Sequence, residues 1–430
     1  MKKILLVLID GMRKDYINQE DTPFLFSKLN KGILVEELVK EAVFCERSEI
    51  YTGENSQITG NYAAFTFDPD KSPYKGLRKF GKIRNLTDFF GYTLPKKMGG
   101  RPGLILYKIH KKLRRYIQNY ILKENGFSMN DIPSKFLDLF RLTEDHLPYD
   151  NANSFNCPTI FDSLKKNGLT WCNYFDDLRV SENKLSRDER LERIIKSFSS
   201  PHSLFLFADS EIDAFGHIKG TSREARKNTV RKVDGIMKKL HDAFLEINQE
   251  GIIIFFSPHG MMDVEKVFDP ESRLKQFIKE NKLKVPKDVV FFIDSTMVRV
   301  WGPKSNKLKS LFRSEPWSTF GTFVSPEIAS RYNIHANNDE VIWWTNPGIC
   351  NFPDFFRRYS APKGMHGYFM NVKEMNGFAI VLGKNLPLKT IYSDYLKNLK
   401  ATIEDLLLIP LTEGDKKRSW LNMGKHKNKN

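Results

Sequence analysis

The stretch SLFLFADSEIDAFGH, which runs from Ser203 to His217, places carboxylates and a histidine directly after a short apolar run. The run from Leu204 to Ala208 is rich in phenylalanine, as is typical of a strand that is buried on both faces. Asp213 and His217 follow it, and both side-chain types bind divalent metals well. Taken alone, the stretch fits a metal site and a solvated acidic loop about equally well.

Two further apolar runs end in the same way. Ile4–Ile9 leads into Asp10, and Gly251–Phe256 leads into a Ser-Pro-His sequence that contains His259. In an open α/β sheet, ligands bind at the carboxyl ends of the strands. Because a buried charge without a partner is costly, three such endings favour one shared site. The sequence therefore predicts an α/β fold, with a mostly parallel central sheet flanked by helices and a metal site at one edge of that sheet.

Two inserted segments interrupt the alternation of strands and helices. A chain of 430 residues is long enough for one large α/β domain that carries caps. We expect a core in three parts (1–70, 157–263 and 363–412), a basic helical cap at 71–156, an aromatic-rich α+β cap at 264–362, and a basic, disordered tail at 413–430.

The positive charge of the chain is concentrated in the first inserted segment. The net charge is +16, and residues 71–123 hold 15 Lys and Arg against one acid, Asp88. Glycines at 99–103 predict a loop, followed by a helix at 104–122 whose apolar stripe includes Leu106, Ile109, Leu113, Tyr116, Ile117 and Tyr120. A stripe packed on the core, with a solvated basic face, is the favoured interpretation by about two to one. The alternative is a surface for an anionic membrane or a polyanionic substrate.

Cysteine usage and hydropathy indicate where the protein acts. The four cysteines form no CxxC pair and no dense framework, which fits free thiols in a reducing compartment. No stretch approaches the roughly 18 apolar residues of a membrane span. The apolar N-terminus has no small-residue cleavage site and predicts a first strand rather than a signal peptide. We therefore expect a cytoplasmic protein, with peripheral attachment to a membrane as the alternative.

The residues from Phe44 to Gly53 predict a short helix with Cys45 in its first turn. A helix N-terminus attracts anions and lowers the pKa of a thiol, which makes Cys45 a candidate nucleophile. The alternative is that Cys45 is a small buried apolar residue, which is usual for a free cysteine.

Four motifs, in this order, resemble those of the alkaline phosphatase superfamily, and most closely its nucleotide pyrophosphatase/phosphodiesterase branch. The motifs are Asp10-Gly-Met-Arg13, Glu211 to His217, Ser257-Pro-His259-Gly-Met261 and Gly364-Met-His366-Gly-Tyr368. The resemblance covers about residues 1–65, 157–263 and 364–410 and neither inserted segment. Each motif is weak alone, but their order makes the combination specific.

The resemblance implies two metal ions side by side. One would be bound by Asp213, His217 and His366, and the other by Asp10, His259, the nucleophile and a further aspartate. That aspartate position holds Pro258, which has no ligand atom. The implied cofactor is a divalent metal, most plausibly zinc, as one or two ions, with manganese or magnesium as alternatives.

The resemblance also implies a Thr or Ser nucleophile nine positions before Thr52, where this chain has Val43. A shift of two residues brings Cys45 to that place, and Ser48 is the reserve. The sequence around Cys45 is not the one that sulfatases modify to formylglycine. Arg47 and Asn61 are the predicted substrate-binding residues.

The leading hypothesis is a metal-dependent hydrolase of phosphate esters, a phosphodiesterase or nucleotide pyrophosphatase-like enzyme that acts by in-line phosphoryl transfer. Its substrate would be a small-molecule or polymer-linked phosphate ester. A second hypothesis is a phosphatase or transferase for lipid- or polymer-linked phosphate. A third is a non-catalytic member that binds one metal and a phosphorylated ligand. Nucleic acid is an unlikely partner, because no reader motif accompanies the basic segment.

Overall fold

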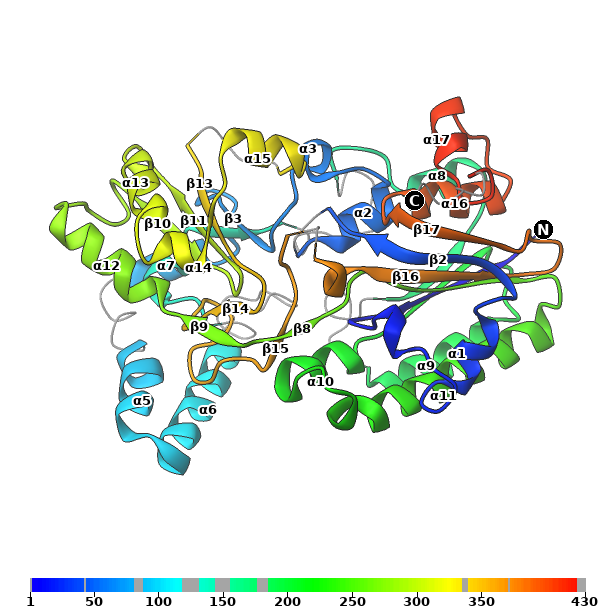
Figure 1. The fold of residues 1–430 in the computed structure, drawn as a ribbon, viewed down its shortest axis with the longest axis horizontal. Coiled ribbons are helices and arrows are strands. Elements are labelled where there is room, and N and C mark those ends of the chain that lie inside the picture. Colours follow the sequence, from blue (N-terminus) through cyan, green and yellow to red (C-terminus); the bar gives the residue numbers. More distant parts are fainter. Residues whose placement is uncertain are drawn as a thin grey trace.

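A seven-stranded sheet forms the centre of the larger lobe (Figure 1). The structure, a computed structural model, describes residues 2–41, 44–80, 88–117, 131–143, 155–175, 185–334, 339–369 and 372–423. The strand order is β17 (Lys389–Tyr395), β2 (Gly32–Val39), β16 (Gly377–Leu382), β7 (Ile252–Ser257), β1 (Ile4–Ile9), β6 (Leu204–Asp209) and β5 (Trp171–Tyr174). Only β16 runs antiparallel to its neighbours within this sheet. The predicted α/β fold with a mostly parallel sheet is confirmed.

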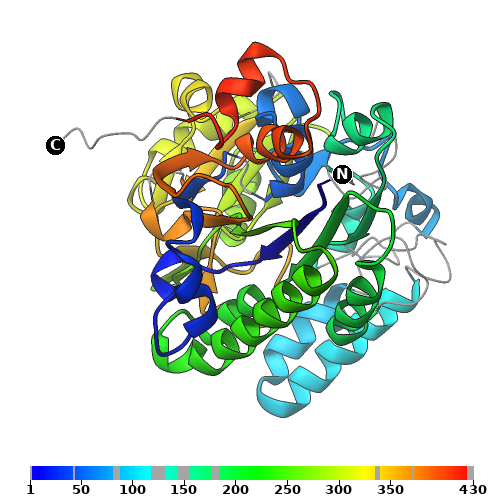
Figure 2. The ribbon, with the colours of Figure 1, turned by 90° about the vertical axis from the view of Figure 1, so that its right-hand side faces the viewer.

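Alternating residues of β1 pack on opposite faces of the sheet, as the two-residue period of a strand requires. Ile4, Leu6 and Leu8 join an apolar cluster with α2 (Glu46–Thr52), α8 (Ile160–Lys166) and α16 (Asn398–Leu406). Leu5, Val7 and Ile9 join a second cluster with α1 (Pro23–Lys28), α9 (Arg187–Ser197) and α11 (Arg223–Ile247). The two helical layers are visible above and below the sheet in Figures 1 and 2. Both faces of β1 are therefore buried, which explains its uninterrupted apolar sequence.

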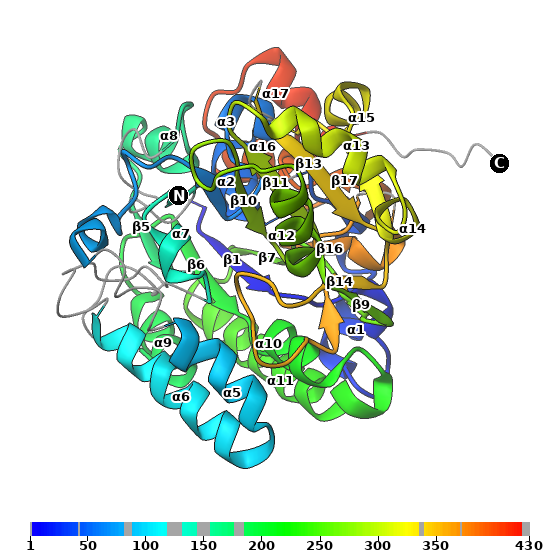
Figure 3. The same ribbon diagram turned by 90° about the vertical axis from the view of Figure 1, so that its left-hand side faces the viewer.

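The two inserted segments share one apolar core in the smaller lobe. An antiparallel sheet of β10 (Val290–Ile293), β11 (Met297–Trp301), β13 (Val341–Thr345) and β12 (Gly321–Phe323) comes from the second segment. The hairpin of β3 (Phe65–Phe67) and β4 (Phe140–Leu142) packs against it, with the rings of Phe65 and Phe292 stacked at 5.1 Å. The cap thus combines the two inserted segments with β3, which lies in the stretch 1–70 that was expected to belong to the core. Figure 3 shows this lobe from its outer side.

Shorter elements surround these two sheets. They are α3 (Ser56–Thr59), α7 (Ser134–Leu137), α10 (Glu211–Lys219), α12 (Pro270–Glu280), α13 (Leu308–Arg313), α14 (Trp317–Phe320), α15 (Pro326–Arg331), β8 (Met262–Asp263), β9 (Lys266–Phe268), β14 (Ile349–Asn351) and β15 (Gly364–Met365).

The basic segment forms a hairpin of α5 (Leu94–Met98) and α6 (Gly100–Tyr116), and it corrects two expectations. The expected loop at 99–103 is mostly helical, because α6 begins at Gly100. The favoured packing of the apolar stripe on the core is also wrong, since Ile109, Leu113 and Tyr116 are exposed. Tyr120 lies outside the described residues. Within the described ranges, no helix is both long and apolar enough to cross a membrane.

The C-terminal residues are folded further than the sequence indicated. Instead of disorder from residue 413, a helix α17 covers Glu413–Arg418 and is followed by Trp420, which is 0% exposed. The Trp420 ring nitrogen donates a hydrogen bond to the Asp394 carboxylate at 2.5 Å. The free energy gained by burying the indole of Trp420 stabilises this segment, although the surrounding sequence is rich in lysine. Residues 424–430 lie outside the described part of the chain.

Trp420→Ala should reduce the free energy of unfolding by about 3–5 kcal/mol, because it removes a fully buried aromatic side chain. Urea unfolding followed by circular dichroism measures the change. Leu408→Ala is the matched control, since Leu408 is 78% exposed, and it should stay within about 0.5 kcal/mol of the wild type. Equal stability of the Trp420 variant and the wild type would show that this segment does not pack on the core.

Candidate metal centre

Five side chains converge at the carboxyl edge of the central sheet. Asp10 follows β1, and Asp213 and His217 lie on α10, directly after β6. His259 follows β7, and His366 follows β15. The neighbouring parallel strands β6, β1 and β7 deliver four of these residues to one place. The structure thus brings together all five residues that the sequence singled out as metal ligands.

One group of three donors consists of Asp213, His217 and His366. Their potential ligand atoms all lie within 4.8 Å of one another. The Nε2 atoms of His217 and His366 each lie 3.5 Å from a different oxygen of Asp213. Two imidazole nitrogens and one carboxylate form a donor set that suits zinc and leaves a coordination position for a substrate.

A second group consists of Asp10, Asp213 and His259, again within 4.8 Å. The Nε2 of His259 lies 3.1 Å from the Oδ1 of Asp10. The rings of His259 and His366 stack with their centroids 4.0 Å apart, so the two groups adjoin. Asp213 belongs to both groups, and it therefore determines whether two ions can be held at once.

Glycines allow the backbones of these elements to approach each other closely. Gly11 has a φ of +70°, and a Cβ at this position would lie 2.8 Å from the Cα of Asp213. A Cβ on Gly364 would lie 2.7 Å from the carbonyl oxygen of Gly216. Any larger residue would push Asp10 away from Asp213 or the His366 loop away from α10, since such contacts are too short for a Cβ.

Backbone carbonyls orient two of the imidazole rings. Nδ1 of His217 lies 2.9 Å from the carbonyl oxygen of Gly364, and Nδ1 of His259 lies 3.0 Å from that of Gly260. A carbonyl can only accept, so Nδ1 is the donor in each ring. In the neutral ring Nε2 is then the free lone pair, and such a contact is typical of a metal-binding histidine.

The two aspartates are held in different protonation states when no cation is bound. Burial disfavours the charge of Asp10, but the hydrogen bond and charge of His259 outweigh it and lower the pKa of Asp10 to about 2. Burial and the neighbouring Asp10 carboxylate raise the pKa of Asp213 to about 7. A nearby cation would relieve this repulsion.

The histidines of the first group are kept neutral by their surroundings. Burial, with Arg357 nearby, lowers the pKa of His217 to about 4. Burial and the charges of His259 and His217 lower the pKa of His366 well below its usual value. Neutral imidazole is the form that binds a metal.

The residues fit one divalent ion well. Oδ1 of Asp213 is buried and has no hydrogen-bond donor among the described residues, and the same is true of a ring nitrogen, Nδ1, in His366. A buried polar atom without a partner is rare and requires an explanation, and a cation supplies one for the carboxylate. The second group fits an ion only by sharing Asp213, because Pro258 offers no ligand atom.

The nucleophile candidates lie at the start of α2. Cys45 is the N-cap residue, is fully buried, and has its sulfur 3.2 Å from the Thr143 hydroxyl. It belongs to neither three-donor group among the described residues. The Ser48 hydroxyl accepts a hydrogen bond from the Asn61 amide at 3.1 Å. The alternative position, Val43, lies outside the described residues. The roles of Cys45 and Ser48 stay predictions.

Charged residues that the sequence analysis did not select also surround the centre. Lys40 follows β2. Its ammonium group is buried and lies 3.6 Å from the Glu46 carboxylate. Arg47, a predicted substrate-binding residue, is paired with Glu46 at 3.1 Å. Arg357 comes from the second inserted segment, and its charge influences the pKa values of Asp213 and His217. Its Nη1 is buried without a hydrogen-bond partner in the described chain. The position of Lys40 at a strand end was a usable signal, whereas nothing in the sequence pointed to Arg357.

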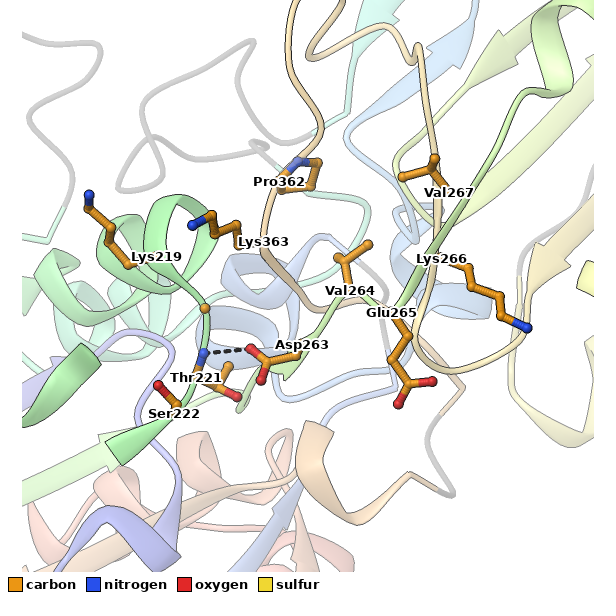
Figure 4. A pocket seen from close by; sticks show the side chains of 11 residues that line it. Lys219, Thr221, Ser222, Asp263, Val264, Glu265, Lys266, Val267, Pro362 and Lys363 are labelled. Carbon is orange, nitrogen blue, oxygen red and sulfur yellow. Dashed lines mark hydrogen bonds between the residues drawn. The ribbon is translucent and has the colours of Figure 1, made fainter. Parts of the chain in front are cut away.

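A separate pocket of about 400 Å³ lies where α10 ends, near β8 and β9 (Figure 4). Its wall includes Lys219, Lys363 and Asp263, and the Asp263 carboxylate accepts a hydrogen bond from the Thr221 amide at 2.6 Å. None of the five candidate ligands lines it. The pocket is therefore distinct from the metal centre.

The sequence matches one known protein family. The family model for type I phosphodiesterase/nucleotide pyrophosphatase matches residues 4–316. The chain belongs to this family. The match includes Asp10, Asp213, His217 and His259, while His366 lies beyond it. The predicted family is confirmed, but the match also covers the first inserted segment and part of the second, which the four motifs did not include.

Solved structures of one family member share the fold. An inactive variant of murine ectonucleotide pyrophosphatase/phosphodiesterase 5 in complex with AMP has a TM-score of 0.63 and 16% sequence identity. The human ectonucleotide pyrophosphatase/phosphodiesterase 5 has a TM-score of 0.63 and 17% identity. Each comparison covers 96% of both chains. At this identity the likeness establishes the fold alone.

His217→Ala should abolish tight metal binding, because it removes one of three ligands while the other two sit on separate elements. Inductively coupled plasma mass spectrometry of the purified protein measures the metal content. His202→Ala is the matched control, since His202 is only partly buried, contacts Thr170 and belongs to neither donor group. Equal metal content in the two variants would contradict the assignment of His217.

Proposed function

We propose that this chain is a metal-dependent phosphodiesterase that transfers a phosphoryl group in line. The observation that carries the proposal is the pair of donor groups that share Asp213 at the edge of the sheet. Membership of the phosphodiesterase family supports the same class of reaction. Zinc is the proposed metal, because each donor group combines imidazole nitrogen with carboxylate oxygen.

Three side-chain cations favour a phosphate ester as the substrate. Burial raises the pKa of Asp10, whereas His259 and, less strongly, Arg47 and Lys40 lower it. Burial and Asp10 raise the pKa of Asp213, and Arg357 opposes this rise. The positive charges of Lys40, Arg47 and Arg357 therefore act on the candidate ligands. A negatively charged phosphate at the centre would be stabilised by these charges.

Different residues of the chain would bind the metal and the phosphate. Asp213, His217 and His366 would hold the ion, and Asp10 with His259 would hold a second ion where one binds. A bound divalent metal supplies positive charge that stabilises the phosphoryl oxygens in the transition state. Arg357 and Lys40 would orient the phosphate and neutralise the remaining charge, in surroundings from which burial excludes water.

The proposed nucleophile is Cys45, with Ser48 as the reserve. The Cys45 thiolate would form a bond to phosphorus while the bond from phosphorus to the leaving alcohol breaks, and water would then hydrolyse the thiophosphate ester. Its two neighbours in the chain lie near the centre. The ring of Phe44 lies 5.5 Å from that of His366. Burial lowers the pKa of His259, whereas the charges of Asp10 and Glu46 raise it.

Cys45→Ala should lower kcat at least 100-fold if Cys45 attacks phosphorus, since the covalent step would be lost. Hydrolysis of bis(4-nitrophenyl) phosphate by metal-loaded protein measures it. Cys157→Ala is the control, because Cys157 is a partly buried free thiol elsewhere. Full activity of the Cys45 variant would contradict the role of Cys45 and would assign the attack to another residue, such as Ser48, or to water.

Arg357→Gln should lower kcat/KM for the same diester about 100-fold, the typical effect of removing one preorganised donor. Chelation by EDTA should abolish the activity, and added zinc should restore it. Lys384→Gln is a charge-matched control, because Lys384 is exposed and pairs with Glu250. An Arg357 variant within twofold of the wild type would contradict a role of Arg357 in phosphate binding.

Two alternatives keep specific support. Hydrolysis or transfer of a lipid- or polymer-linked phosphate is favoured by the exposed basic hairpin of α5 and α6. A non-catalytic role as a binder of one metal and a phosphorylated ligand is favoured by Pro258. Absence of turnover on aryl mono- and diesters by fully metal-loaded protein would favour this last alternative over the proposal.

We also propose that the protein acts in the cytoplasm. The four cysteines are free in the structure, which fits a reducing compartment.

A nucleotide is one candidate among the small phosphate esters, because the murine family member was solved with AMP.

A further inference from the structure

The hairpin of α5 and α6 carries a row of exposed apolar side chains. Ile105, Ile109 and Tyr116 on α6 are 58%, 56% and 55% exposed, and Leu113 lies next to them at 49%. At 3.6 residues per turn, the first three fall within an arc of about 40°. They therefore form one continuous apolar strip along the outer side of the helix.

Basic residues border this strip on one side. Arg101, Lys108, Lys112 and Arg115 are all exposed. The same helical periodicity places them within about 80° of the strip's edge at Ile105. The outer surface of α6 is thus half apolar and half cationic.

The inner face of α6 is polar, which fixes the apolar strip on the outside. Asp131 is 0% exposed and accepts hydrogen bonds from the Tyr107 hydroxyl at 2.5 Å and the Lys111 ammonium at 2.8 Å. Arg114 donates to the carbonyl oxygen of Ile132 at 2.8 Å. Turning the helix over would leave the buried Asp131 carboxylate without these partners, at a high cost in free energy.

Exposed apolar and basic side chains also occur on α5 and on the π-helical turn Phe89–Thr93 before it. Phe89, Phe90 and Met98 are exposed, as are Lys96 and Lys97. Within 88–117 the single acid is Asp88, which is engaged by the backbone amide and hydroxyl of Ser134. No exposed carboxylate of this hairpin therefore offsets its cations. The hairpin stands away from both sheets in Figures 1 and 3.

We propose that the α5–α6 hairpin docks the protein on an anionic membrane surface, with its apolar strip inserted between the lipid headgroups. A helix with a strongly basic polar face beside an aromatic and aliphatic face is the type that lies in the membrane interface. Each basic residue near an anionic leaflet adds to the affinity. Charge selects this occupant over a second copy of the chain, because two copies would bring like charges together.

The hairpin is connected to the metal centre through the segment that contains Arg357. The Tyr359 ring stacks on that of Tyr107 at 5.1 Å, and its hydroxyl donates to the carbonyl oxygen of Gly100 at 2.9 Å. The backbone amide of Arg358 donates to Asp131 at 3.1 Å. Docking would therefore bring the membrane surface close to the elements that hold Arg357. The docking proposal itself does not depend on the proposed reaction.

Flotation of the full-length protein with vesicles tests the proposal. Vesicles of phosphatidylcholine with about one third phosphatidylglycerol should bind the protein at about 0.05 M salt and release it at about 0.5 M, as screening shortens the Debye length. Vesicles of phosphatidylcholine alone should bind at least tenfold less. Changing Lys108, Lys112 and Arg115 together to Gln should weaken binding on the order of 100-fold.

The apolar strip is tested by a second variant, in which Ile109, Leu113 and Tyr116 are changed together to Ser. This variant should lose at least tenfold in binding while keeping the wild-type rate on a soluble aryl ester. Controls are Leu388, Tyr392 and Leu408 changed together to Ser, and Lys239, Lys279 and Lys307 changed together to Gln. These side chains are exposed elsewhere on the protein, so both controls should bind like the wild type.

Three results would overturn the proposal. The first is no binding of the wild type to anionic vesicles at low salt. The second is unchanged binding of the apolar variant, which would indicate non-specific attraction of charge. The third is self-association in light scattering that the apolar variant abolishes, without vesicle binding, which would identify a second copy of the chain as the occupant.

Discussion

The close approach of Asp10 and Asp213 is the constraint on which the rest of this site depends. Gly11 allows the backbone after β1 to pass within contact distance of Asp213, and no side chain larger than hydrogen fits there. Burial and the repulsion of the neighbouring Asp10 carboxylate raise the pKa of Asp213 to about 7. A divalent ion removes this repulsion. The fold therefore stores an unfavourable interaction that metal binding relieves.

The smaller lobe completes the site from outside the central sheet. Its core is common to both inserted segments, because the β3–β4 hairpin packs on the antiparallel sheet through Phe65, Phe140 and Phe292. Phe356 packs on this core and contacts Phe44, whose ring lies 5.5 Å from that of His366. Burial and the charge of the neighbouring Arg357 lower the pKa of His217. The candidate metal centre is thereby combined with a cap from the inserted segments, and we propose that this cap sets the substrate preference.

Much of the fold and of the donor set could be predicted from the sequence, for a physical reason. Strands buried on both faces have uninterrupted apolar sequences, so β1, β6 and β7 and the ligands at their ends were recognisable. The orientation of α6 could not be predicted in this way. An apolar stripe usually faces a core, but here the buried Asp131 binds polar side chains of α6 and turns the stripe outward. Arg357 was equally invisible, since its position depends on contacts between segments distant in sequence. The C-terminal segment was also mispredicted, because its lysine-rich sequence suggested disorder whereas the buried Trp420 anchors it to the core.

The central claim is that Asp213, His217 and His366 bind one ion and that Asp213 couples it to the Asp10–His259 pair. Anomalous diffraction at the zinc absorption edge, from crystals of the protein grown with zinc, tests this most directly. The account predicts a peak about 2 Å from the carboxylate of Asp213 and from the ring nitrogens of His217 and His366. A peak that touches none of these three residues, or an ion held only by Asp10 and His259, would contradict it.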